Sequence, residues 1–185
     1  MRKTVLLLAS MAFAVVVASE VALAAPIEGT DASEVIFGTP ENDIIYGFAG
    51  GDFIRGLAGD DEVHGGTQPD KLWGDEPESN NQLDPLPGGE DTLFGESGND
   101  QITGYGGNDT LRGGRGKDSL DGSRGADTLY GSDGDDTINT GQIDAMTNLI
   151  PDKAVDHVYC GPGLDLVIYE DDEDVVVGCE GKISY

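Results

Sequence analysis

Acidic residues recur every nine positions along much of the chain, and this regular spacing is the strongest chemical signal in the sequence. Paired carboxylates can hydrolyse glycosidic bonds, and they can also bind a cation. A long series of similar units accounts for the spacing better than a single catalytic pair does, so we interpret the series as cation-binding. Its members are Glu34, Asp43, Asp52, Asp61, Asp70, Asp91, Asp100, Asp109, Asp118, Asp127 and Asp136.

Calcium is the cation that suits these carboxylates best. It takes about six to eight oxygen ligands at about 2.3–2.6 Å, whereas magnesium prefers a smaller and more hydrated octahedron. Soft metals are disfavoured, because the chain has only His64, His157 and two cysteines, and none of them has the spacing of a ligand set.

Each acidic residue belongs to a nine-residue unit with a fixed pattern. Counted from the first glycine, the acid is at position six, a branched aliphatic residue is at position eight, and glycine is common at positions one and four. Positions seven to nine, such as Thr110-Leu111-Arg112, favour a short strand with the aliphatic side chain inward. The glycines permit left-handed or tight backbone angles that turn carbonyl oxygens toward a common point. The position-eight residues predicted to form the core are Ile36, Ile45, Ile54, Val63, Leu72, Leu93, Ile102, Leu111, Leu120, Leu129 and Ile138.

Two segments break this period. Residues 74–85 are rich in Asp, Asn and Pro and are predicted to form a surface loop, and residues 140–150 form a second interruption. Beyond the second interruption, degenerate units put Asp156, Asp165 and Asp174 at position six. We therefore predict a repeat domain over 26–139 that contains the 74–85 insertion, and a C-terminal cap of degenerate repeats over 140–185.

The units resemble a known family of repeats. Residues 104–112, Gly-Tyr-Gly-Gly-Asn-Asp-Thr-Leu-Arg, and residues 113–121, Gly-Gly-Arg-Gly-Lys-Asp-Ser-Leu-Asp, are similar to the repeats of RTX (hemolysin-type) calcium-binding proteins. The resemblance implies an all-β fold, a parallel β-roll or β-solenoid in which two units complete one coil. Residues eighteen apart would then stack, which would pair Asp100 with Asp118 and Asp109 with Asp127.

The resemblance also implies the ligands of several calcium ions. It assigns the position-six carboxylate as the side-chain ligand and leaves the other ligands to backbone oxygens. Glu34 departs from the pattern because its side chain is longer, and the loops of Asp43, Asp70 and Asp156 lack glycine at position four. The predicted metal ligands are Asp43, Asp52, Asp61, Asp70, Asp91, Asp100, Asp109, Asp118, Asp127, Asp136 and Asp165.

The two cysteines are expected to pair within the implied roll. Cys160 and Cys179 are nineteen residues apart, so stacking would put them on neighbouring coils about 4.8 Å apart, a separation that a disulfide can span. The segment Cys160-Gly-Pro-Gly-Leu-Asp also resembles the closing segment of secreted members of the family. Two reduced thiols are the alternative.

The N-terminus predicts export. Met1-Arg2-Lys3 is a short basic start, residues 4–18 are largely apolar, and Ala22-Leu23-Ala24 is a small-residue cleavage pattern. This combination is typical of a secretory signal peptide, here residues 1–25, and the alternative is a retained membrane anchor. A secreted protein would meet both calcium and an oxidising environment.

Charge narrows the classes of partner and raises the question of how the chain folds. With 36 acidic and 10 basic residues, the formal net charge is -26, which argues against nucleic acid and against anionic membranes as partners. Stacked carboxylates repel each other, and one inward aliphatic side chain per unit makes a thin core. We therefore expect folding to depend on calcium.

The sequence predicts a binding protein that is not an enzyme. It contains neither His-Glu-x-x-His nor Gly-x-Ser-x-Gly, and beyond the N-terminal segment it has no apolar stretch for membrane insertion. Two alternatives stay open: an accessory domain of an extracellular enzyme, and a calcium-dependent adhesin or surface protein with an extracellular ligand. The aromatic residues that could form such an adhesive surface are Tyr46, Trp73, Phe94, Tyr105 and Tyr130.

Overall fold

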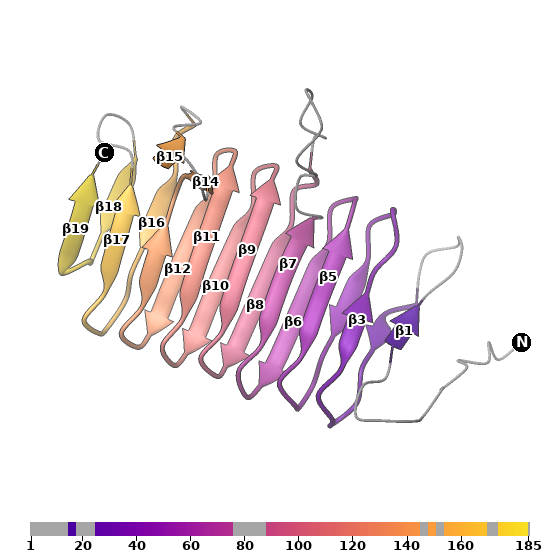
Figure 1. Ribbon diagram of the computed structural model, residues 1–185. Coiled ribbons are helices and arrows are strands. Elements are labelled where there is room, and N and C mark those ends of the chain that lie inside the picture. The colour runs from indigo at the N-terminus through magenta and orange to yellow at the C-terminus, as the bar shows by residue number, and fades with distance from the viewer. Residues whose placement is uncertain are drawn as a thin grey trace, which may run out of the picture.

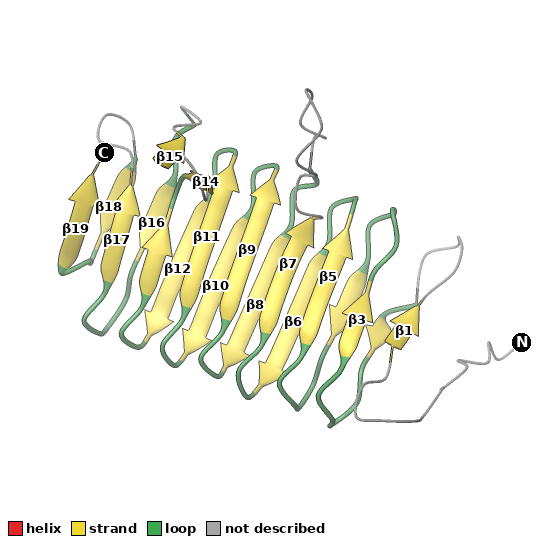
Figure 2. Ribbon diagram, viewed as in Figure 1, coloured by secondary structure: helices red, strands yellow, loops and turns green. Residues whose placement is uncertain are grey.

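The chain winds into a flattened solenoid of two facing sheets. The computed structural model describes residues 15–17, 25–75, 88–144, 148–150, 154–169 and 174–184. Over these residues all regular structure is strand and the loops gather at the two edges of the solenoid, as Figure 2 shows. The fold is therefore the all-β parallel β-solenoid that the sequence predicts.

Successive strands alternate between the two sheets, so each coil contributes one strand to each (Figure 1). Sheet A consists of β1 (Val15–Val17), β3 (Val35–Phe37), β5 (Phe53–Leu57), β7 (Lys71–Asp75), β9 (Gln101–Gly106), β11 (Ser119–Arg124), β13 (Thr137–Asn139), β17 (Leu166–Tyr169) and β19 (Gly181–Ser184). Sheet B consists of β2 (Ile27–Glu28), β4 (Ile44–Tyr46), β6 (Glu62–Thr67), β8 (Thr92–Ser97), β10 (Thr110–Arg115), β12 (Thr128–Asp133), β16 (His157–Tyr159) and β18 (Val175–Val177).

The strand register follows the period of the sequence. Within regular coils, paired residues are eighteen apart, as in Leu111 opposite Leu129. At the two interruptions the pairing continues across a longer separation, with Val63 opposite Leu93 and Leu129 opposite Val158. The extra residues are therefore excluded from the stack, and the coils on either side pack as if neither interruption were present.

The core is a double file of aliphatic side chains between the sheets. Every position-eight residue predicted for it is at most 1% exposed, because alternation along each short strand points that side chain inward. Val158 and Val167 extend the file through the degenerate C-terminal units, and Val176 is partly buried against it. One aliphatic residue per strand makes this core narrow.

The loops use two left-handed positions. At position four, φ is positive at Gly107 (119°) and at Gln68 (81°). Position two is left-handed as well, even where the residue is Tyr105 or Ser132. Position one, where we also expected unusual angles, is not left-handed. Its glycines are needed instead because the backbone of the next coil and a carboxylate approach too closely for a Cβ.

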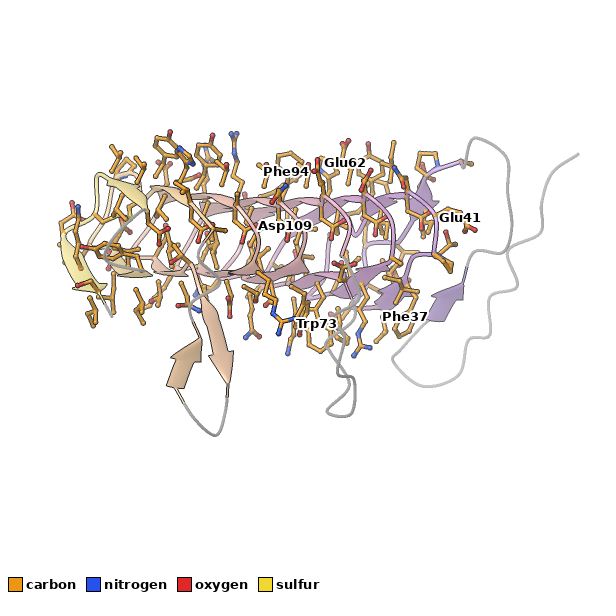
Figure 3. The ribbon with its side chains drawn as sticks, turned by 90° about the horizontal axis from the view of Figure 1, so that it is seen from above. Phe37, Glu41, Glu62, Trp73, Phe94 and Asp109 are labelled. Carbon is orange, nitrogen blue, oxygen red and sulfur yellow. A yellow bond between two sulfur atoms is a disulfide. The ribbon has the colours of Figure 1, made fainter. Side chains whose placement is uncertain are left out.

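The interruptions differ in form. The first two residues of the predicted 74–85 insertion, Gly74 and Asp75, are the end of β7, and residues 76–87 lie outside the described part of the chain. In the second interruption, β14 (Gln142–Asp144) and β15 (Asn148–Ile150) form a separate antiparallel hairpin. It projects from the side of the solenoid (Figure 3).

The C-terminal coil is fastened by the predicted disulfide. Cys160 and Cys179 are bonded, with their Cα atoms 5.2 Å apart, and the Cys160 N–H donates to the Val177 carbonyl. Beyond the disulfide, β19 pairs with β17 and closes sheet A.

The N-terminal coil includes one strand from the predicted signal peptide. Val15–Val17 form β1 and pair with β3, while the rest of residues 1–24 lies outside the described residues. The described residues include no helix with the length and apolarity needed to cross a membrane.

Candidate metal centres

The acidic residues at position six form two stacked rows, one along each edge of the solenoid. We call the row that precedes the strands of sheet A the first ladder; it contains Glu34, Asp52, Asp70, Asp100, Asp118, Asp136 and Asp165. The second ladder precedes the strands of sheet B and contains Asp43, Asp61, Asp91, Asp109, Asp127, Asp156 and Asp174. In the view of Figure 3, Asp109 lies between the two sheets, whereas Trp73 and Phe94 point away from the solenoid.

We call each acidic residue of a ladder a rung, and in every rung after the first of its ladder one carboxylate oxygen accepts a backbone N–H from the preceding coil. The Asp100 N–H donates to Asp118 Oδ1 at 2.9 Å, and the Asp109 N–H donates to Asp127 Oδ1 at 2.8 Å. The same bond crosses the first interruption, where the Asp61 N–H donates to Asp91 Oδ1 at 2.8 Å. The stacking predicted from an eighteen-residue coil is therefore present, and it continues through the interruption.

The second carboxylate oxygen has no hydrogen-bond partner in most rungs. These Oδ2 atoms are buried, and an unsatisfied buried acceptor normally carries a considerable desolvation cost. Buried carboxylate oxygens without hydrogen-bond donors are expected when they serve as ligands of a cation. The rungs concerned are Asp52, Asp61, Asp70, Asp91, Asp100, Asp109, Asp118, Asp136 and Asp165.

Most of the orphaned oxygens face a backbone carbonyl oxygen of the next coil, and we call the region between the two oxygens the gap. A Cβ on Gly95 would stand 2.5 Å from Asp100 Oδ2 and 2.6 Å from the Gly113 carbonyl oxygen of the next coil. Gly113 has the same surroundings, with Asp118 Oδ2 on one side and the Gly131 carbonyl on the other. Glycine at position one thus allows a carboxylate oxygen and a carbonyl oxygen to lie close together, and no hydrogen-bond donor reaches the carboxylate oxygen.

Burial makes these carboxylates costly to ionise in the absence of a cation. Desolvation raises the pKa of Asp61 and Asp109 from 3.8 to about 8, and that of Asp70, Asp91 and Asp100 to about 7. The hydrogen bond from the preceding coil lowers these pKa values in part, and for all but Asp91 a neighbouring rung raises them further. A divalent cation would offset both the burial and the repulsion.

Three rungs with irregular loops behave differently from one another. Asp43 Oδ2 accepts hydrogen bonds from the Thr39 N–H at 2.5 Å and from the Thr39 hydroxyl at 2.9 Å. Glu34 Oε2 is similarly occupied by the Thr30 N–H at 2.6 Å. Asp70 keeps an orphaned Oδ2 although Gln68, in a left-handed conformation, replaces glycine at position four.

The far end of each ladder lies in the degenerate C-terminal units. Asp127 N–H donates to Asp156 Oδ1, and Asp156 N–H donates in turn to Asp174 Oδ1 at 3.0 Å. In the first ladder the last acceptor is Glu180, whose Oε2 receives the Asp165 N–H at 3.1 Å. Sequence analysis missed Glu180 because it follows Cys179 outside the nine-residue register.

Sequence analysis also missed Asp75, which was counted with the insertion. Asp75 ends β7 at position two, is 7% exposed and has an unpartnered Oδ2. Burial raises its pKa to about 6. The sequence signal that could have identified Asp75 is its position directly after Gly74, the position-one glycine of the interrupted coil. Gly74 has the surroundings of the other position-one glycines, since a Cβ there would stand 2.9 Å from the Gly104 carbonyl oxygen and against Asp91 Oδ2.

Side chains alone do not complete a metal centre anywhere in the described ranges, since no three Asp, Glu, His or Cys side chains converge on one point there. Any bound ion must therefore take most of its ligands from backbone carbonyls. Hard cations accept such ligands and soft metals do not, so the arrangement favours calcium over zinc or copper.

Comparison with known families agrees with this geometry. A model of the RTX calcium-binding nonapeptide repeat matches four copies in this chain, at residues 28–63, 55–76, 88–120 and 112–142. These segments together cover more than half of the sequence. The chain belongs to the RTX repeat family. None of the curated proteins compared with it matches.

Membership of the RTX family makes calcium the expected ion, and the residues fit it. Asp carboxylates and loop carbonyls supply hard oxygen ligands, and the position-one glycines leave space between them. The matched segments span the rungs from Glu34 to Asp136, whereas Asp156, Asp165 and Asp174 lie beyond them.

Proposed function

We propose that this protein is a secreted calcium-binding module without catalytic activity, and that binding of several calcium ions drives its folding. One observation carries the proposal: two files of buried aspartates present unpartnered Oδ2 atoms to the carbonyl oxygens of neighbouring coils. Oxygen acceptors that face each other need a proton or a cation between them. At neutral pH a divalent cation serves this purpose for carboxylates that repel one another.

Coupling to folding follows from where the ligands come from. Each gap is bounded by a carboxylate of one coil and a glycine carbonyl of the next, such as Asp118 Oδ2 and Gly131 O, so the gap exists only when the coils are stacked. A site that is absent from the unfolded chain contributes its binding free energy to folding. The narrow aliphatic core leaves stability dependent on this contribution.

Secretion is supported by the N-terminal sequence and by the disulfide. Structural disulfides persist in oxidising compartments, and extracellular calcium modules bind in the range of about 0.1–1 mM. Cleavage after Ala24 or Ala25 would remove β1 and leave β3 at the end of sheet A. The absence of a catalytic role is supported by the repeat itself, which accounts for the acidic residues without a catalytic pair.

Circular dichroism during calcium titration tests the proposal. Protein stripped with chelator is expected to show little strand signal at neutral pH, and calcium is expected to restore the signal cooperatively near millimolar concentration. Magnesium at the same concentration is the control and should restore much less. A complete strand signal in chelator would rule out calcium-coupled folding.

A calcium-dependent adhesin is the second candidate, and a cluster on the outer face of sheet A favours it. The Arg55 guanidinium lies 4.3 Å from the Trp73 ring centroid and 4.7 Å from that of Phe53, and Lys71 Nζ lies 5.0 Å from Trp73. Aromatic faces beside cations suit carboxylated sugars. Binding to a glycan array in calcium, lost in Trp73→Ala, would support this candidate; equal binding by the variant would exclude this surface.

A further inference from the structure

Asp75 is a buried acid that the nonapeptide pattern does not explain. It stands at position two, where regular coils have residues such as Leu57 and Tyr105, and it is 7% exposed. Its Oδ2 is buried and accepts no hydrogen bond. An ionised oxygen in this setting requires a compensating charge, and no basic side chain of the described residues lowers its pKa.

The orphaned oxygen of Asp75 faces a carbonyl in the same manner as the ladder oxygens. A Cβ on Gly88 would overlap both Asp75 Oδ2 and the Gly106 carbonyl oxygen, so these two acceptors lie close to each other. The rest of the carboxylate is held by backbone hydrogen bonding from Gly89 and Gly106. A second gap of this kind therefore lies beside the one formed by Gly74, Asp91 and Gly104.

The surroundings of this gap are strongly anionic. Asp75 lies close enough to Asp61, Asp91 and Asp109 that its charge contributes to raising the pKa of each of them. The negative potential of these four carboxylates favours a cation at this edge of the solenoid.

We propose that Asp75 and the Gly106 carbonyl form an additional calcium site, outside the nonapeptide pattern, where the coil is interrupted. The inference rests on the proposed calcium function and adds one ion to it. Asp75 precedes the interruption and Gly88 follows it, so one ion at this point holds both ends of the interruption against the next coil. A trivalent lanthanide, which also prefers oxygen ligands, binds the same site.

Substitution of Asp75 by Asn separates a ligand from a simple brace. Asparagine retains an oxygen that can accept the backbone hydrogen bonds, but it removes the charge, so a purely structural role would survive. Asp133→Asn is the matched control, since Asp133 is exposed at position three and the change removes the same charge. Equilibrium dialysis counts bound calcium, and terbium luminescence sensitised by Trp73, the only tryptophan, reports the neighbouring site.

We expect Asp75→Asn to bind one calcium fewer than wild type and to lose part of the tryptophan-sensitised terbium emission, while Asp133→Asn matches wild type in both. Equal stoichiometry and emission in Asp75→Asn would overturn the inference. Wild type that neither binds calcium nor responds to it would instead overturn the proposed function. If Asp75→Asn does not fold, anomalous scattering from terbium in wild-type crystals decides, because the inference requires an ion bonded to Asp75.

Discussion

Most ladder aspartates have two separate tasks, one for each carboxylate oxygen. Oδ1 accepts the backbone N–H of the preceding coil, as Asp118 does for Asp100 at 2.9 Å, and Oδ2 points into the gap beside a glycine carbonyl. The first task stacks the coils and needs only an acceptor. The second needs a negative charge and a cation, so the two tasks respond differently to substitution.

Asp109→Asn is expected to weaken calcium binding while preserving the stack. The asparagine side chain would still offer an oxygen to the Asp91 N–H, but the charge in the gap would be lost. We expect the calcium midpoint for folding to rise about tenfold, equivalent to ~1.4 kcal/mol. Circular dichroism during calcium titration measures this midpoint.

Asp43→Asn provides the comparison within the same ladder. Asp43 Oδ2 already accepts two hydrogen bonds from Thr39, so the neutral side chain should change the midpoint much less. Similar midpoints for the two variants would contradict the distinction between satisfied and orphaned rungs.

At the scale of single residues, the sequence predicts the stacking of the ladders but not the state of each Oδ2. The difference between Asp43 and Asp52 depends on whether a loop residue such as Thr39 turns its hydroxyl toward the carboxylate. Asp75 could not be recognised because no repeat position requires an acid there. The hydrogen bonds of each Oδ2 and the burial of Asp75 depend on local packing that a nine-residue pattern does not encode.

The loops are the elements in which backbone strain is concentrated. Position four is left-handed in several coils, and Gln68 adopts this conformation at φ 81° without being glycine. A side chain with Cβ costs about 1–2 kcal/mol in this conformation. Glycine at the same position in other coils, such as Gly59 and Gly107, avoids that cost.

Gln68→Gly is expected to stabilise the calcium-bound protein by roughly 0.5–1 kcal/mol, because relief of strain exceeds the added backbone entropy of the unfolded chain. Urea unfolding in saturating calcium measures the difference. Gln101→Gly, at an exposed strand position of β9, should instead destabilise. A loss of stability in Gln68→Gly would contradict the assignment of strain to position four.

We expect the C-terminal coil to depend on its disulfide, since β19 is the last strand of sheet A among the described residues. Cys179→Ser should lower the free energy of unfolding of this coil by about 3 kcal/mol, the loss expected for a loop of this length. Hydrogen exchange in calcium should show faster exchange in β18 and β19. If hydrogen exchange in β18 and β19 is the same in Cys179→Ser as in wild type, and if reduction of wild type does not change it either, then the disulfide does not stabilise this coil.

At the scale of elements, the strands and core were predictable because position eight alternates so regularly with outward residues. The residues that interrupt the stack were harder to predict than the strands. The sequence suggests that a loop begins at Gly74, yet Gly74 lies within β7 and is the position-one glycine next to Asp91. The β14–β15 hairpin carries no repeat signal, because it pairs only with itself.

For the whole molecule, protons and calcium should substitute for each other. Folded carboxylates such as Asp61, Asp91 and Asp136 have pKa values of about 8, 7 and 6, above the 3.8 of the unfolded chain. Because the folded state then binds more protons, the stability that these groups contribute without calcium is fully present below pH 3.8 and is lost as the pH rises through these values.

Chelated protein is therefore expected to gain strand signal on acidification from about pH 8 to pH 5 without any calcium. Circular dichroism at a series of pH values in chelator measures this gain. Sodium chloride at neutral pH is the control, since salt screens exposed charges but not buried rungs. If salt alone restores the strand signal, then repulsion between exposed charges limits folding. If acid does not restore it, then ionisation of the buried ladder carboxylates is not what limits folding.

We propose that the solenoid is compact because cations lie between its buried aspartates. Small-angle X-ray scattering at neutral pH, before and after addition of chelator, measures whether compactness depends on these cations. The chelated chain should expand to a radius of gyration of roughly 45 Å, the value for an unfolded chain of this length, from less than half of that in calcium. A chelated protein that keeps the dimensions of the calcium form would contradict the claim.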